Sequence, residues 1–178
     1  MKLLDYLFSE KQHVEIPAQP NLESAWLSSN FIFRWLTRLH DWGVHAEEYK
    51  RLKGSDEDRI FALYKKLLAK YKKEPLVLQS LYYELAMMRA ELGHGAKEYL
   101  KLAQQSVLQH YRKSRTVSGV ALQNAGRDAC SSCRKLDGWL LTLSQAEKKK
   151  LLPNPRCAKK HGKAVFCRCT YEPVMEKR

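Results

Sequence analysis

The cysteines are the residues of this chain whose type and spacing could do chemistry. Cys130 and Cys133 stand two residues apart, and Cys157, Cys167 and Cys169 follow. Zinc takes four thiolate or imidazole ligands in a tetrahedron, and a two-residue gap lets two sulfurs of one tight turn reach the same ion. A second pair must then arrive from a distant stretch and close a loop. The sequence therefore predicts a Zn²⁺ site formed by Cys130, Cys133, Cys157 and Cys169.

The fourth ligand is the least defined part of this site. The alternation from Val165 to Tyr171 is typical of a strand, and its period of two places Cys167 and Cys169 on one face. On a flat strand their sulfurs start about 6.6 Å apart, which is too far for two ligands of one ion without a bend. We therefore expect only one of them to bind. Cys169 is the first choice, Cys167 is the alternative, and His161 is a further candidate.

Inert buried thiols and disulfides are the two other states open to the cysteines. Five is an odd number, and the chain begins MKLLDYLFSE, where an acidic residue interrupts an apolar run too short for a signal peptide. No uninterrupted apolar stretch approaches the roughly 20 residues that span a bilayer. We therefore expect a soluble protein without a membrane partner in the reducing cytoplasm, where thiols stay available to a metal.

Positive charge is concentrated in the part of the chain that carries the cysteines. Residues 1–110 contain 16 Lys and Arg against 14 Asp and Glu, whereas residues 111–178 contain 16 against 5. A surface of this sign attracts polyanions, of which nucleic acid is the commonest. The residues that we expect to contact nucleic acid are Lys148, Lys149, Lys150, Arg156, Lys159, Lys160, Lys163 and Arg168.

A solvated face is the alternative interpretation of the same cations. Four thiolates around a divalent ion leave a negative local charge, which Arg134, Lys135 and Arg168 would neutralise. Lysine-rich surfaces also maintain solubility without any partner. Composition alone leaves both interpretations open.

Apolar periodicity predicts a mainly α fold before the cysteines. Residues 1–21 lack clear periodicity and are interpreted as an N-terminal arm, and the aromatic-rich stretch 22–42 is interpreted as a helix. Ser55 and Asp58 have the spacing of a capping box, and stripes of apolar residues then predict helices broken near Pro75 and Gly93 and ending near Tyr111. We expect these helices to pack as an N-terminal helical bundle over residues 22–115.

The pattern changes at residue 116, after which we expect a small zinc-stabilised α+β module over residues 116–178 with a basic surface. Short strands are predicted over residues 117–122 and 139–142, separated by the turn signal Asp137-Gly138. Ser144 and Glu147 have the spacing of a capping box for a short helix that ends before Pro153.

The cysteine segment also resembles a known family. The run DACSSCRKLDG over residues 128–138, followed by Leu152-Pro153, Cys157 and Cys167-Arg168-Cys169, resembles the C-terminal cysteine segment of phage Mu F-like head-morphogenesis proteins. The resemblance covers about 50 of the 178 residues. It implies a metal-binding fold within a minor head or DNA-packaging-associated protein, or within a bacterial relative of one.

Two departures from the family pattern bear on the ligands. The family places a His-Pro shortly before its Cys-Arg-Cys, whereas this chain has Asn154-Pro155-Arg156-Cys157 and then an insertion over residues 158–166. The resemblance therefore implies that Cys157 replaces the histidine of the family as a ligand. The part before Thr116 has no counterpart in the resemblance.

A non-enzymatic binding or assembly protein is the function that these features favour. A site closed by four sulfurs leaves no coordination position for water or substrate, and the sequence indicates no small-molecule substrate. The expected partner is a protein or capsid component, with nucleic acid as a second partner, and the expected location is the cytoplasm, or the virion if a phage encodes the chain.

Catalysis is the alternative. A metal-dependent nuclease would need a second, open metal site, for which His161 with Asn154 or Asp137 is the candidate set. The other histidine motif, His13-Val14-Glu15, has the spacing seen in zinc deaminases but lies far from the cysteines and lacks the matching Pro-Cys-x-x-Cys.

Overall fold

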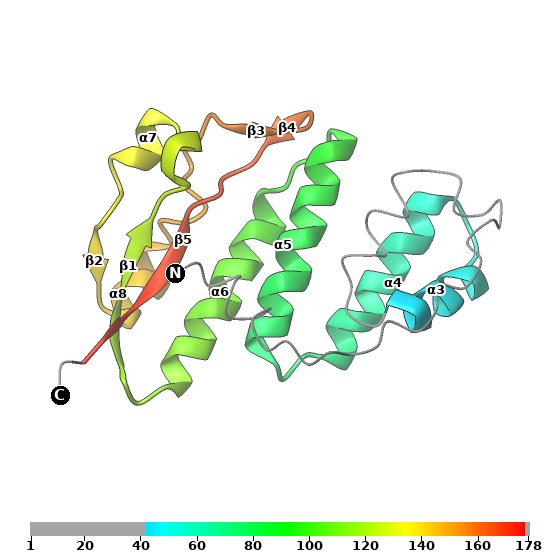
Figure 1. Ribbon diagram of the computed structural model, residues 1–178, viewed down its shortest axis with the longest axis horizontal. Coiled ribbons are helices and arrows are strands. Elements are labelled where there is room, and N and C mark those ends of the chain that lie inside the picture. Colours follow the sequence, from blue (N-terminus) through cyan, green and yellow to red (C-terminus); the bar gives the residue numbers. More distant parts are fainter. Residues whose placement is uncertain (1–41, 177–178) are drawn as a thin grey trace, which may run out of the picture. The chain divides into compact units, whose positions relative to one another are not determined.

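The computed structural model describes residues 42–176, and their side chains from residue 47 onward (Figure 1). From Gly43 onward, the described residues belong to one compact unit. The predicted N-terminal arm over residues 1–21 and most of the aromatic helix predicted over residues 22–42 therefore lie outside the described residues.

Two helices precede the central hairpin. Helix α3 spans Trp42–Arg51 and helix α4 spans Asp56–Lys70. The predicted capping box at the start of α4 is confirmed, because the Ser55 hydroxyl accepts the Asp58 N–H and the Asp58 carboxylate accepts the Ser55 N–H. The face of α4 that carries Ile60, Leu63, Tyr64 and Leu67 is buried, as the apolar stripe predicts.

Helices α5 (Pro75–Leu92) and α6 (Lys97–Lys113) form an antiparallel hairpin, which is the longest helical part of the described chain (Figure 1). Gly93 ends α5 with a φ of 89°, a left-handed conformation that suits glycine. The Tyr64 hydroxyl donates to the Glu84 carboxylate at 2.7 Å and thereby links α4 to α5. The predicted helices are thus present, but a bundle with the aromatic helix falls outside the described residues.

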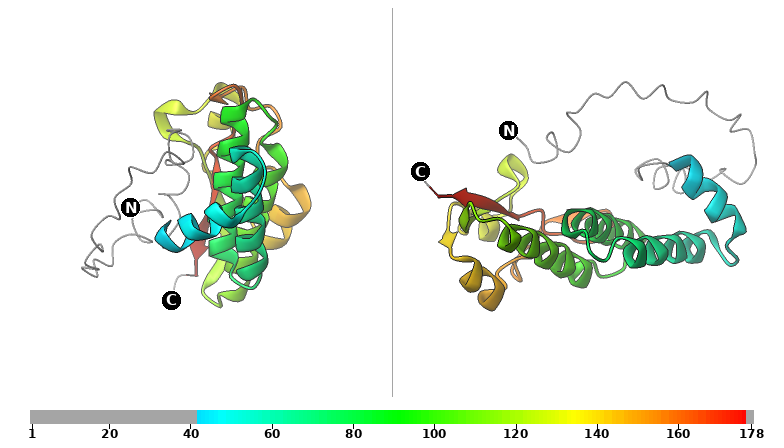
Figure 2. Two further views of the ribbon diagram at one scale, coloured as in Figure 1. Left: turned by 90° about the vertical axis from the view of Figure 1, so that its right-hand side faces the viewer. Right: turned by 90° about the horizontal axis from the view of Figure 1, so that it is seen from below.

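A small antiparallel sheet packs beside the hairpin. Strands β1 (Val117–Gln123), β2 (Leu140–Leu141) and β5 (Thr170–Met175) lie in the order β2-β1-β5. Leu122 pairs with Tyr171, and both side chains are almost completely buried. Helices α6 and α8 (Leu143–Lys149) contact the sheet on the same side (Figure 2). The strands predicted over residues 117–122 and 139–142 are confirmed.

Two local predictions in this part are wrong. The strand predicted from Val165 to Tyr171 is not continuous, because β4 (Ala164–Val165) ends before Phe166 and β5 begins only at Thr170. The capping box of α8 is formed by Thr142 and Gln145 and not by Ser144 and Glu147. Thr142 and Gln145 have the same spacing two residues earlier, and the earlier start places Ala146 in the core.

The remaining elements are short. A 3₁₀ turn η2 spans Gly126–Asp128, helix α7 spans Ser131–Arg134, and strand β3 (Lys160–His161) pairs with β4 as a two-stranded hairpin. The amide of Lys163 donates to the Ala90 carbonyl at 3.0 Å, so the turn of this hairpin docks on the last turn of α5.

One cluster of buried residues runs through the hairpin, the sheet and the cysteines. It contains Ala86 and Leu100 from α5 and α6, and Cys133, Phe166 and Cys167 from the cysteine segment. The predicted domain boundary at residue 116 therefore lies inside a shared core, and the helices α5 and α6 form one wall of the site.

Within the described residues, no helix is both long and apolar enough to cross a membrane.

Candidate metal centre

Three separate segments deliver the five cysteines to one place. Cys130 precedes α7, and its carbonyl accepts the amides of Cys133 and Arg134, each at 3.0 Å, which forms the tight turn expected of a Cys-x-x-Cys pair. Cys157 follows a turn in which its amide donates to the Asn154 carbonyl at 3.0 Å. Cys167 lies in the irregular segment between β4 and β5.

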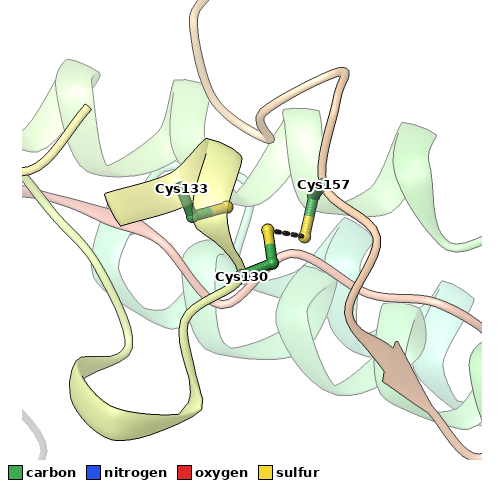
Figure 3. Close-up of side chains that lie close together, drawn as sticks. All are labelled: Cys130, Cys133 and Cys157. Carbon is green, nitrogen blue, oxygen red and sulfur yellow. Dashed lines mark hydrogen bonds between the residues drawn. The ribbon is translucent and has the colours of Figure 1, made fainter. Parts of the chain in front are cut away.

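Several of the sulfur atoms lie close enough together to be ligands of a metal ion. The Sγ atoms of Cys130 and Cys157 lie 3.9 Å apart, and Figure 3 shows the Cys133 sulfur turned toward the same point. The Sγ atoms of Cys133 and Cys167 also lie 3.9 Å apart. In a tetrahedron with zinc–sulfur bonds of about 2.3 Å, neighbouring sulfurs are about 3.8 Å apart. Both pairs match this edge length.

The sulfurs form two overlapping groups that share Cys133. In the first group, formed by Cys130, Cys133 and Cys157, all ligand atoms lie within 4.8 Å of one another, and the same holds for Cys133, Cys167 and Cys169. A cysteine cluster that could hold a metal ion is thus present. All five cysteines are free thiols and none is bridged to another, so the disulfide alternative is not realised in this structure.

Between β4 and β5 the chain is irregular, and both Cys167 and Cys169 lie near Cys133. The expectation that only one could bind assumed a flat strand, but residues 166–169 have no regular structure and both sulfurs reach Cys133. The distance argument for choosing between them therefore no longer applies.

The thiols differ in acidity. Burial opposes ionisation of Cys130, but the Ser132 hydroxyl and backbone hydrogen bonds outweigh it and lower the pKa of Cys130 to about 6. The neighbouring Cys169 thiol, against the opposing effect of burial, lowers the pKa of Cys167 to about 6. Burial raises the pKa of Cys133 and of Cys157. Each sulfur group therefore contains one thiolate at neutral pH that could begin metal capture.

The sulfurs are positioned by polar contacts that the sequence did not indicate. The Ser132 hydroxyl lies 3.1 Å from the Cys130 sulfur and 2.7 Å from the Arg156 carbonyl oxygen, so it links the first turn to the segment before Cys157. The buried Asn154 side chain donates to the Cys133 sulfur at 3.5 Å and accepts the Arg156 amide at 3.0 Å. From the sequence, Asn154 was a candidate nuclease residue and not a contact of the sulfurs; its position three residues before Cys157 was the available signal.

The candidate nuclease set is engaged elsewhere. His161 Nε2 lies 3.1 Å from the Glu91 carboxylate and His161 Nδ1 lies 3.4 Å from the Arg168 guanidinium. The Asp137 carboxylate accepts the Asn124 amide at 2.9 Å. Among the described residues, the groups that could hold a metal contain only cysteines. The structure thus does not gather His161 with Asp137 as metal ligands, and His161 does not join the sulfurs either.

Seven of the eight basic residues expected to bind nucleic acid fall into two separate groups, and Arg156 stands apart from both. Lys148, Lys149 and Lys150 lie at the end of α8, whereas Lys159, Lys160, Lys163 and Arg168 lie in or beside the β3–β4 hairpin, at the other end of the sheet (Figure 1). Arg156 is exposed between them in the sequence. Asp128 forms ion pairs with Lys159 at 3.4 Å and with Arg168 at 3.6 Å, which offsets part of the charge of the hairpin group.

Comparison of the chain with protein-family models, with curated proteins and with solved structures finds no match in any of the three. What the chain can do must therefore be argued from the sulfur cluster and its surroundings.

Proposed function

We propose that this chain is a zinc-stabilised, non-enzymatic binding or assembly protein. The observation that carries the proposal is the convergence of five sulfurs from three segments, with two sulfur pairs at the edge length of a zinc tetrahedron. The elements in and between these segments are short: α7 has 4 residues, α8 has 7, and β2, β3 and β4 have 2 each. A bound ion supplies the missing constraint.

Zinc is the metal that the donor set favours. Thiolate ligands select zinc, copper(I) or iron–sulfur chemistry, and hard cations such as magnesium require oxygen ligands. The tight spacing of the sulfurs suits a single ion better than a cluster, whose cysteine ligands bind separate iron atoms. Four sulfur ligands also close the coordination sphere, and such sites are structural.

Cys130, Cys133, Cys157 and Cys167 are the ligands in this proposal. Cys133 belongs to both sulfur groups, and the Sγ atoms of Cys133 and Cys167 lie 3.9 Å apart. Cys169, the first choice from sequence, then remains as a thiol beside the Cys167 sulfur, where it contributes a hydrogen bond and not a metal bond.

Assembly is the role that the resemblance to phage head-morphogenesis proteins supports, together with the excess of basic residues after residue 110. The zinc site would fix the loop that links α7, the β3–β4 hairpin and β5. The partner would be a capsid component or another protein, with nucleic acid contacting the α8 lysines. The protein would be located in the virion if a phage encodes it, and in the cytoplasm otherwise.

Metal content of cysteine variants tests the proposal. Full-length protein purified without added chelator should contain one zinc ion per chain by elemental analysis. Cys133→Ser should abolish zinc, whereas the matched variant Cys169→Ser should retain it. Absence of zinc from the wild-type protein after growth with zinc would contradict the zinc centre. Retention by Cys133→Ser would contradict the ligand assignment.

The non-enzymatic part has its own test. Wild-type protein incubated with plasmid DNA and magnesium should leave the plasmid intact. Cleavage that is lost in His161→Ala would show instead that the nuclease alternative is correct.

A further inference from the structure

The sulfurs of the cysteine segment are arranged in threes. Cys130, Cys133 and Cys157 form one group, and Cys133, Cys167 and Cys169 form the other. Within each group all sulfurs lie within 4.8 Å of one another, and each group has three members. A tetrahedral zinc ion has to draw a fourth sulfur toward one of the groups, whereas an ion with three thiolate ligands fits each group as it stands.

The sulfur–sulfur distances suit planar three-sulfur sites. With metal–sulfur bonds as long as those to zinc, about 2.3 Å, three sulfurs around one ion in a plane lie about 4.0 Å apart. The Sγ atoms of Cys130 and Cys157, in the first group, lie 3.9 Å apart. The Sγ atoms of Cys133 and Cys167, in the second group, also lie 3.9 Å apart. One edge of each triangle therefore has the length that such a site requires.

The number of cysteines matches two such sites that share one ligand. Two separate three-sulfur sites need six sulfurs, and a shared sulfur reduces this number to five, which is the number of cysteines in the chain. The shared residue is Cys133. In the zinc site proposed above, Cys169 is left without a metal, although its side chain is buried at 5% exposure. Two bridged ions would use every sulfur.

The surroundings of Cys133 suit a bridging ligand. A thiolate sulfur has three lone pairs, so it can bind two metal ions and still accept one hydrogen bond. The side-chain nitrogen of the buried Asn154 donates to the Cys133 sulfur at 3.5 Å. The side-chain oxygen of Asn154 accepts the Arg156 amide at 3.0 Å, which fixes the orientation of the Asn154 amide. The hydrogen bond thus occupies one lone pair of the sulfur and leaves two for metal ions.

Copper(I) is the ion that this arrangement favours. Thiolates select soft ions, whereas hard cations require oxygen ligands. Copper(I) is soft and commonly binds three thiolates in a plane. Among the described residues, the groups that could hold a metal contain only cysteines. Cys133, Cys157, Cys167 and Cys169 are buried, which shields bound copper(I) from dissolved oxygen, and Cys130 is partly exposed.

We propose that the five sulfurs bind two copper(I) ions, one in each group, with the Cys133 sulfur as the bridge, and that copper(I) displaces the structural zinc. The four thiolates of the zinc site and the Cys169 thiol become five thiolates around two Cu⁺, and the exchange releases Zn²⁺ and one H⁺. No electron is transferred. Thiolates favour the softer copper(I) ion over zinc, so the exchange runs toward copper when copper(I) is supplied. The copper state uses the sulfurs directly and does not require zinc to be bound first.

The probe is copper(I) itself, added without oxygen as its acetonitrile complex to the full-length protein, with the chelator bicinchoninate present to remove weakly bound copper. After desalting, we expect two copper ions per chain by elemental analysis, release of any zinc, and about three sulfurs around each copper by X-ray absorption. Saturation at one copper per chain, retention of more than two, or nitrogen ligands around the copper would overturn the proposal.

Cys169→Ser is the matched variant, because it removes a sulfur that the copper state uses and the zinc site does not. It should keep one zinc ion per chain, which also shows that it folds. It should lose one of its two copper ions at a bicinchoninate concentration at which the wild-type protein keeps both. Retention of both by the variant would refute the two-site assignment. Uptake of two copper ions by a wild-type protein that binds no zinc would refute the zinc centre alone.

Discussion

The α5–α6 hairpin and the cysteine segment (residues 126–169) are built in opposite ways. The hairpin consists of helices of 18 and 17 residues that bury apolar side chains along their length. The cysteine segment contains only short elements, and its buried residues include Cys133, Cys157, Cys167 and Cys169. Burial of one large apolar side chain contributes about 1.5–3 kcal/mol, so the hairpin can be ordered by packing alone. In the function that we propose, the cysteine segment depends in addition on the metal that its sulfurs hold.

Removal of the metal should produce the largest difference between the cysteine segment and the α5–α6 hairpin. With a chelator at neutral pH, we expect amides of the cysteine segment to lose protection from hydrogen exchange while those of α5 and α6 keep it, because metal binding by such a site is coupled to local folding. Hydrogen exchange followed by mass spectrometry measures this. Equal loss of protection in both regions would show that the hairpin also needs the metal. No loss in either region would show that neither region needs a metal to stay folded.

In the metal-free protein, the lowered pKa values of two thiols of the cysteine segment should make the free energy of unfolding depend on pH. The pKa values of Cys130 and Cys167, about 6, lie below the ordinary value of 9.0. A lowered pKa stabilises the folded state above the ordinary pKa, and this contribution is lost as the pH falls from about 9 through about 6. We therefore expect the free energy of unfolding to decrease over this window.

Thiolate absorbance in the ultraviolet can assign the effect to particular residues. Cys130→Ser and Cys167→Ser should each remove one thiolate at neutral pH. Cys157→Ser should remove none, because burial raises the pKa of that thiol. An equal change in all three variants would contradict the difference in acidity between the sulfur groups.

The contrast also explains what the sequence could predict. Helix α4 was correctly predicted because the Ser55–Asp58 box and the apolar stripe are local signals. The segment from Phe166 to Cys169 was misjudged as a strand because alternation is also local, whereas the bend there is accompanied by long-range contacts, among them the Gln104 bond to the Cys169 carbonyl. Such contacts join residues 65 apart and leave no periodic trace in the sequence.

The candidate site divides in the same way. The spacing of Cys130 and Cys133 was enough to predict their shared turn. The contact of Asn154 with the Cys133 sulfur and the separation of the lysines into two groups required the folded chain.

A smaller effect is expected where the cysteine segment docks on the hairpin. Gly162 has a φ of 58°, and a Cβ at this position would lie 2.8 Å from the Glu91 Cα of α5. Gly126 has a similar φ of 62° but no atom within 4 Å of its Cβ position. Gly126→Ala should therefore cost only the left-handed strain, about 1–2 kcal/mol, and Gly162→Ala about 1–3 kcal/mol more because of overpacking.

Chemical denaturation of the zinc-bound protein measures both glycine variants. The added cost at Gly162 reports the close approach of the β3–β4 turn to α5. Equal free energies of unfolding for the two variants would mean that the turn can move away without penalty, and that the hairpin and the cysteine segment are less tightly joined than the structure indicates.

Replacement of the lysines should have the smallest effect on stability. The two regions compared here are the lysine group at the end of α8 and the basic group at the β3–β4 hairpin. Replacement of Lys148, Lys149 and Lys150 by Gln should change the free energy of unfolding by less than about 0.5 kcal/mol, because these side chains are exposed. A triple Gln variant of Lys159, Lys160 and Lys163 is the matched control, and a similarly small change is expected because Lys160 and Lys163 are exposed and Lys159 is partly exposed.

Binding to DNA duplex should distinguish the groups where stability does not. Each lysine that contacts a phosphate contributes about one to the slope of log affinity against log salt concentration. The α8 lysines form no ion pair with another described residue, whereas Lys159 is already paired with Asp128. The α8 variant should therefore lose more of the slope, by about three against about two for the control. A slope near zero for the wild-type protein would mean that neither group contacts DNA phosphates. A larger loss of slope in the control variant would place the nucleic-acid contact beside the metal centre.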